Sequence, residues 1–152
     1  MEVFRLSKKR FAKDLIGKGA ELAGGRWNSK GTAVLYTAQS RALCTAELAV
    51  HLPLQIVPKD YQLITIEIPN DIAYFEPKRL PKDWNSLPHS DSTQKIGDQF
   101  VVKNEFLMMK VPSVVVQGDF NYVLNPLHPL FSKITIKKIE SYRFDKRFFI
   151  KK

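Results

Sequence analysis

The chain has one cysteine and three histidines among its 152 residues, which leaves little material for a disulfide or a metal centre. Cys44 has no partner for an internal disulfide and no neighbouring ligands at the spacing of a zinc site. The histidines, His51, His89 and His128, are too scattered to share a metal ion with it. We therefore expect no metal site, and we expect Cys44 to be a small buried residue.

Long apolar runs and familiar catalytic motifs are also missing. No segment approaches the roughly 20 apolar residues of a membrane-spanning helix, and the opening MEVFRLSKKRF lacks the apolar core of a secretory signal. No serine lies in a G-x-S-x-G elbow, and the segment GKGAELAGG lacks the lysine spacing of a phosphate-binding loop. We expect a cytoplasmic protein without membrane contacts and without a serine hydrolase triad.

The composition, in contrast, is that of a folded domain with a strong positive charge. Hydrophobic residues make up 44% and charged residues 26% of the chain, and the length fits one domain spanning residues 1–152. The net charge of +9 indicates an anionic partner. Because the lysines are dispersed and the aromatics do not alternate with arginines, we expect no direct binding of nucleic acid. A phosphate-bearing small molecule or an acidic protein would suit the same charge.

The hydrophobic pattern predicts an α+β fold. Alternation predicts strands at 2–7, 32–37, 61–68, 106–110, 113–117, 121–125 and 134–144. Helical spacing predicts helices at 40–52 and 93–103 and a short helical piece around 11–16, followed by a loop marked by Gly17 and Gly19. Residues 71–92 are typical of a long surface loop, residues 126–132 of a turn or one-turn helix, and residues 148–150 of a packed end. Gly97 weakens the prediction of the second helix.

The helix at 40–52 carries an unexpected charge. Ser40 is suited to be its N-cap, and Leu43, Ala46 and Val50 form an apolar stripe. Glu47 lies four residues after Leu43, so it projects from the same stripe, where loss of water is costly unless a donor compensates. Taken alone, the helix is also compatible with a glutamate at the stripe's edge that reaches solvent or pairs with a lysine.

Three further residues are candidates for binding. Arg26 follows two glycines and can grip a phosphate with its forked guanidinium, or it can form a structural ion pair with Glu47. Tyr36 ends a strand in which it shares one face with Val34, while Leu35 lies on the other face. It can point into a cleft, or it can be a core aromatic, as strand tyrosines commonly are. Ser113 follows a proline at the predicted start of a strand, where a hydroxyl also bonds to the backbone.

Together these residues resemble a known family. The segment GGRWNSKGTAVLYTAQSRALCTAELAVHL, residues 24–52, closely resembles the signature of the RES domain, a family of bacterial toxins named after an arginine, a glutamate and a serine. The match places these three at Arg26, Glu47 and Ser113, the last in KVPSVVV, and the family's strand tyrosine at Tyr36. The opening FRLS also fits, so the resemblance spans nearly the whole chain. Cys44 and its neighbour Thr45 depart from the small apolar residues usual there.

The resemblance implies a fold similar to ADP-ribosyltransferase toxins, with a mixed sheet and flanking helices, and an activity on NAD. Such toxins degrade NAD by hydrolysis or phosphorolysis, or transfer its ADP-ribose to a host protein, and growth arrest follows. It further implies a type II toxin–antitoxin system with an Xre-like helix-turn-helix antitoxin. NAD is then the substrate and no separate cofactor is expected; a homodimer is compatible with the sequence.

The resemblance also implies a role for each residue. Glu47 would stabilise the positive charge that develops on the ribose, and Arg26 would hold the pyrophosphate, which makes these two the catalytic pair. Tyr36 would stack on nicotinamide or ribose, and Ser113 would hydrogen-bond the nicotinamide amide or the ribose. The competing hypothesis is a non-enzymatic basic binding module, in which Glu47 and Tyr36 are structural.

Overall fold

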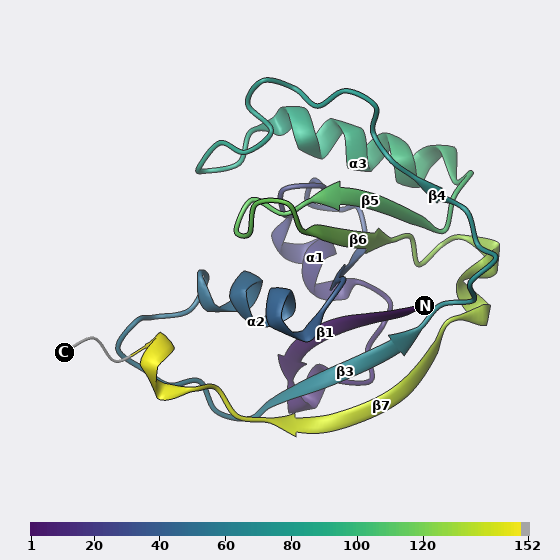
Figure 1. Ribbon diagram of the computed structural model, residues 1–152. Coiled ribbons are helices and arrows are strands. Elements are labelled where there is room, and N and C mark those ends of the chain that lie inside the picture. The colour runs from purple at the N-terminus through teal and green to yellow at the C-terminus, as the bar shows by residue number, and fades with distance from the viewer. Residues whose placement is uncertain (150–152) are drawn as a thin grey trace.

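A seven-stranded sheet organises the chain, with the strand order β4-β5-β6-β2-β1-β3-β7 (Figure 1). The computed structural model describes residues 1–149. Its strands are β1 (Glu2–Lys8), β2 (Leu35–Ala38), β3 (Tyr61–Glu67), β4 (Tyr74–Phe75), β5 (Met108–Pro112), β6 (Phe120–Leu124) and β7 (Thr135–Tyr142). Its helices are α1 (Lys18–Ala23), α2 (Arg41–Ala49) and α3 (Asp91–Lys103), with 3₁₀ turns η1 (Lys9–Phe11), η2 (Pro129–Lys133) and η3 (Lys146–Phe148). Strands β4 and β5 are parallel and the other neighbours antiparallel, so the sheet is mixed and the fold is α+β, as predicted.

Helices α2 and α3 pack on the same face of the sheet. Side chains alternate between faces along a strand, so Tyr36 and Ala38 of β2 share one face. Tyr36 packs with the cluster that holds Phe100 of α3, and Ala38 packs with Leu43 of α2. Figure 1 shows α3 beside β5 and α2 beside β1, with the turn between β5 and β6 in the space between them. This face, between the two helices, is where the candidate site lies.

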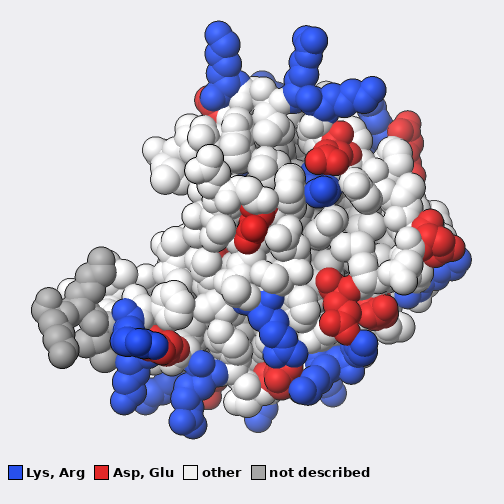
Figure 2. All heavy atoms as spheres, viewed as in Figure 1, with Lys and Arg blue, Asp and Glu red and all other residues white. Residues whose placement is uncertain are grey.

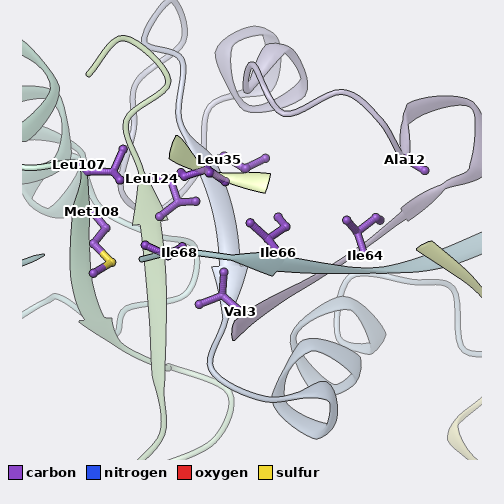
Figure 3. Packing of buried hydrophobic residues seen from close by; sticks show 10 residues of the cluster. Val3, Ala12, Leu35, Ile64, Ile66, Ile68, Leu107, Met108 and Leu124 are labelled. Atoms are coloured by element: carbon purple, nitrogen blue, oxygen red, sulfur yellow. The ribbon is translucent and has the colours of Figure 1, made fainter. Parts of the chain in front are cut away.

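The largest core cluster lies on the opposite face of the sheet. Figure 3 shows this cluster as a row along the sheet, with Met108 near one end, Ile64 near the other, and Val3, Leu35, Ile66, Ile68 and Leu124 between them; all seven are buried. Both faces of the central strands are therefore covered, since Met109 and Val123 pack on the α3 side. At about 25 cal/mol per Å² of buried apolar surface, this two-sided burial is the main stabilising contribution to the sheet.

The predicted alternation of faces is confirmed for two strands. Leu35 lies in the core cluster of the far face, whereas Val34 and Tyr36 lie with the α3 cluster. Along β3 and just after it, Ile64, Ile66 and Ile68 share the far face. Leu63 packs under α2 on the other face. The predicted strand at 32–37 begins later than expected, at Leu35, and ends at Ala38.

Two predictions for the first half of the chain are wrong. The helical piece expected around residues 11–16 is replaced by η1, and the expected glycine loop contains α1. Gly17 is the N-cap of α1 with φ of 75°, and a Cβ there would come within 2.5 Å of the Val34 carbonyl oxygen. This glycine therefore marks a tight entry into a helix rather than a long loop.

The helix around Glu47 is shorter than predicted, and its predicted apolar stripe is buried at Leu43 but not at Val50. It spans Arg41–Ala49 rather than 40–52, and Val50 is 59% exposed. The buried side is formed by Leu43, Cys44 and Thr45, and the Thr45 hydroxyl lies 2.6 Å from that of Tyr142 on β7. Val50 therefore does not anchor the helix, because the buried face turns toward β1 and β7. The prediction that Cys44 is buried is confirmed.

The second half of the chain also differs in detail. The strand predicted at 113–117 is wrong, since β5 ends at Pro112 and a turn follows. The surface segment 71–92 contains the edge strand β4 and the start of α3. The helix predicted at 93–103 is confirmed and begins two residues earlier, and the turn expected at 126–132 includes η2. Near the end Phe149 is buried and Phe148 is half exposed, while Ile150 lies outside the described residues.

Candidate functional site

Glu47 is held on α2 at the edge of the buried face. The Ser40 hydroxyl accepts a hydrogen bond from the Leu43 backbone N–H at 3.0 Å, which starts the helix as predicted. Burial of Leu43 and Cys44 then fixes the rotation of the helix. One turn further on, half-buried Glu47 turns its carboxylate toward the segment that joins β5 to β6. The glutamate that was unexplained by helix packing therefore has specific partners.

Ser113 is the first of these partners. Its Oγ donates to Glu47 Oε1 at 2.6 Å and accepts from the backbone N–H groups of Val115 and Val116 at 3.1 and 2.9 Å. These contacts bend the chain out of β5, which explains why no strand begins here. Because a hydroxyl has one proton and two lone pairs, its hydrogen-bonding capacity is filled by the protein. This geometry favours a role in orienting Glu47 over direct contact with a ligand.

Asn121 is the second partner, and the sequence analysis missed it. Its side-chain Nδ2 donates to the same oxygen, Glu47 Oε1, at 2.7 Å. Asn121 lies on β6 opposite Ala38 of β2, and it shares a face with buried Val123 two residues later. An amide on the inward face of a strand was the available signal in the sequence.

Arg26 is held by a loop distant in sequence. Its Nη1 donates to the carbonyl oxygens of Trp84 and Ser86 at 2.9 and 3.0 Å. Burial lowers the pKa of Arg26, and the nearby charge of Glu47 acts in the opposite direction. Within residues 1–149 no ion pair joins the two side chains, so the structural salt bridge considered as an alternative does not form. Nε and Nη2 carry the other three N–H groups, which make no hydrogen bond to the protein within residues 1–149.

Tyr36 ties the strand to the turn that carries Arg26. Its hydroxyl donates to Asn28 Oδ1 at 2.6 Å and accepts from the Trp27 backbone N–H at 3.0 Å. A Cβ at Gly25 would come within 2.7 Å of this hydroxyl, so the glycine allows the approach. Burial raises the pKa of Tyr36, which keeps it a neutral donor. The phenol has a structural contact, and the half-buried ring packs against the cluster that holds Phe100.

The structure brings the four predicted residues to one face of the sheet. Glu47 contacts Ser113 directly and interacts electrostatically with Arg26, whose charge in turn acts on Tyr36. Figure 2 shows the outline of the molecule indented between the level of α3 and the level of α2, and cations gathered mainly along the upper and lower edges of this face. A separate hollow between α3 and the segment 75–79 contains none of the four residues.

The described part of the chain contains neither a metal-binding cluster nor a membrane-spanning helix. Residues 1–149 contain no group of three or more His, Cys, Asp or Glu side chains placed to hold a metal ion. None of the helices described in this range has the length and apolar character needed to cross a membrane. The side chains that the structure brings to the site are the Glu47 carboxylate, the Arg26 guanidinium and the Tyr36 ring.

Comparisons with known proteins find relatives over nearly the whole chain. The RES domain model matches residues 2–145. The "Prs ADP-ribosylating toxin" of Sphingobium sp. (strain YBL2) is 35% identical over 140 residues, which cover 90% of this chain and 87% of the relative. A "Toxin Res" of Yersinia enterocolitica (serotype O:8 / biotype 1B) is 34% identical over 151 residues, 97% of this chain and 99% of the relative.

The fold has a counterpart among solved structures. A chain in the crystal structure of the M. tuberculosis MbcT–MbcA toxin–antitoxin complex superposes with a TM-score of 0.74 at 18% identity. The superposition covers 93% of this chain and 84% of that one, which shows a shared fold. The family match over nearly the whole length and the identity to curated relatives lead to the same assignment. This chain belongs to the RES domain family.

Proposed function

We propose that this chain is the toxin of a toxin–antitoxin pair and that it cleaves the bond between nicotinamide and ribose in NAD. The observation that carries the proposal is the carboxylate of Glu47, which is held by two donors on one oxygen, Oε1. Within residues 1–149 the other oxygen, Oε2, receives no hydrogen bond, so it is available to a ligand. A half-buried carboxylate fixed in this way is suited to stabilise a cation.

The reaction develops such a cation. As the glycosidic bond breaks, its electron pair leaves with nicotinamide and the ribose becomes oxocarbenium-like. A fixed carboxylate stabilises this positive charge more than it stabilises the neutral ribose of the substrate, and that difference lowers the barrier. An acceptor then adds a lone pair to the ribose carbon and loses its proton. Glu47 is the catalytic residue in this scheme.

Arg26 would bind the pyrophosphate of NAD. Two of its five N–H groups are used by the carbonyl oxygens of Trp84 and Ser86, which fixes the guanidinium plane. The remaining Nε and Nη2 present the fork that pairs with phosphate oxygens. The ring of Tyr36 would stack on the nicotinamide or ribose, and Ser113 would act by orienting Glu47. NAD is the substrate, and the reaction requires no additional cofactor.

The acceptor determines which toxin activity results. Water gives ADP-ribose, phosphate gives ADP-ribose 1″-phosphate, and a host protein gives an ADP-ribosylated product. The Sphingobium relative is named an ADP-ribosylating toxin at 35% identity, and this favours transfer to a protein as the second candidate. All three reactions share the same bond cleavage and the same role for Glu47.

The partner would be an antitoxin. The structural counterpart was crystallised as a toxin–antitoxin complex, and the net charge of +9 suits an acidic protein surface. We propose a helix-turn-helix antitoxin of the Xre type for this chain, which would block access to Glu47. A host protein acceptor would approach the same face.

The test is nicotinamide release by purified protein incubated with NAD, with and without phosphate. Wild type should release nicotinamide, Glu47→Gln should lose nearly all of this activity, and the exposed Glu105→Gln is the matched control with an unchanged rate. A parallel incubation with adenine-labelled NAD and host extract should reveal any modified protein. If wild type releases no nicotinamide with any acceptor, or if Glu47→Gln still arrests growth, a non-enzymatic binding module is the better explanation.

A further inference from the structure

Glu47 carries both of its protein hydrogen bonds on one carboxylate oxygen. Ser113 Oγ and Asn121 Nδ2 approach Oε1 at 2.6 and 2.7 Å, from two different segments on either side of the β5–β6 turn. The Ser113 hydroxyl also accepts from two backbone N–H groups, so its single proton must point to the carboxylate. Oε1 therefore accepts two hydrogen bonds, one from each segment.

We propose that Asn121 is a positioning residue for the reaction: it holds the Glu47 carboxylate rotated so that Oε2 faces the ribose. Serine alone leaves the carboxylate free to turn about its last torsion, because one hydrogen bond does not define a plane. A second donor from β6 removes that freedom. This inference rests on the proposed function and adds a residue that acts through Glu47.

The placement of Asn121 suits this task. It lies in the middle of the sheet, between buried Val111 on β5 as its register partner and Ala38 on β2. Both neighbouring strands are hydrogen-bonded to β6, so the backbone of Asn121 is rigid compared with a loop residue. The amide therefore provides a fixed reference for a carboxylate that belongs to a separate helix.

Three variants separate positioning from structural support. Asn121→Ala removes the donor and should lower kcat about 10- to 100-fold, with KM for NAD within about twofold of wild type because Arg26 still binds the pyrophosphate. Asn121→Asp places a second carboxyl at hydrogen-bond distance from Glu47, so the pair shares a proton. On the acidic side of the plot of kcat against pH, the fall in kcat should then occur about one pH unit or more higher than in wild type. Gln117→Glu makes the same change of charge at an exposed position in the β5–β6 turn and should leave the profile unchanged.

The surroundings make the pH readout specific. Arg26, from the turn before β2, and Cys44, one turn earlier on α2, are titratable groups whose charge interacts with that of Glu47. Neither is altered by the three variants. In a Glu47→Ala background, adding Asn121→Ala should cause no further loss of kcat, since the group that it positions is gone.

The outcomes distinguish this inference from the proposed function. If wild type cleaves NAD and Asn121→Ala has the same kcat, the positioning role is wrong and the proposed function stands. The same holds if the pH dependence of kcat on the acidic side is the same in Asn121→Asp as in wild type. The positioning role is also wrong if kcat falls only in proportion to thermal stability across the variants, and if Asn121→Ala lowers kcat by the same factor in the Glu47→Ala background as in wild type. Absence of any NAD cleavage by wild type overturns the proposed function and this inference together.

Discussion

Gly97 of α3 lies against the backbone carbonyl of Trp27 so closely that a Cβ at Gly97 would come within 1.6 Å of the Trp27 oxygen. This contact docks the helix directly on the turn that carries Arg26. Gln94, one turn earlier, strengthens the contact by donating to the carbonyl oxygens of Gly25 and Asn28 at 3.0 and 3.1 Å. The position of the arginine therefore depends on a glycine about 70 residues away in sequence.

Gly97→Ala should destabilise the protein and weaken NAD binding. Overpacking costs about 1 to 3 kcal/mol in typical cores. Because the new Cβ would meet backbone rather than a flexible side chain, the helix must move away from the Arg26 turn. Urea unfolding and KM for NAD measure the two effects. Gly19→Ala in α1 is the control, since a Cβ there meets nothing within 4 Å; it should leave KM unchanged and stabilise the helix slightly. A Gly97→Ala protein with wild-type stability would contradict the packing.

Ser113→Ala should reduce both activity and stability. It removes one donor to Glu47 and leaves the backbone N–H groups of Val115 and Val116 without their acceptor, a cost of about 1 to 3 kcal/mol when such groups are buried. Ser113→Thr keeps the hydroxyl and should recover most of the activity. The rate of nicotinamide release and the thermal midpoint measure this, and equal activity of the alanine and threonine variants would rule out the hydroxyl's role.

Arg26→Lys should raise KM for NAD strongly while it changes the free energy of unfolding little. A lysine ammonium cannot satisfy two carbonyl oxygens and also present a planar fork to a pyrophosphate. We expect KM to rise about tenfold or more, the loss of one charge-assisted bidentate contact. The exposed Arg79→Lys makes the same exchange away from the site and should leave KM unchanged. An unchanged KM in Arg26→Lys would exclude a pyrophosphate contact through the guanidinium fork.

Cys44 should make the fold sensitive to alkaline pH. Burial raises the pKa of Cys44 to about 12 from 9.0. Because the thiol ionises earlier in the unfolded chain, its contribution to stability is complete below pH 9 and is lost as the pH rises toward 12, at up to about 1.4 kcal/mol per pH unit.

Urea unfolding of wild type and Cys44→Ala between pH 7.5 and 10.5 tests this dependence. The difference in unfolding free energy between the two proteins should be constant below pH 9 and should then shift in favour of the variant, because alanine has no thiol to ionise. Groups common to both proteins cancel in the comparison. A difference that stays constant up to pH 10.5 would show that the thiol ionises equally in both states.

Local patterns predicted much of the fold. The alternation in β3, the Ser40 cap of α2 and the helix ending at Lys103 depend on neighbouring residues, and each is present. The errors occur where tertiary contacts override local preference. Gly17 and Gly97 are read locally as breakers, whereas in the fold they allow close approaches to Val34 and Trp27. Val50 fits the apolar stripe by spacing, yet the sheet buries the adjacent face of the helix.

For the site, the sequence by itself determined the family, the chemical types and the candidates. The segment 24–52 holds Arg26, Tyr36 and Glu47 in one continuous stretch, and the short motif KVPSVVV adds Ser113. Only the tertiary structure decided how they are used. Ser113 and Asn121 both donate to one oxygen of Glu47. Arg26 donates to carbonyl oxygens of a loop rather than to the glutamate. The physical reason is that hydrogen-bond partners more than 50 residues apart are set by strand register and helix docking, which local sequence does not encode.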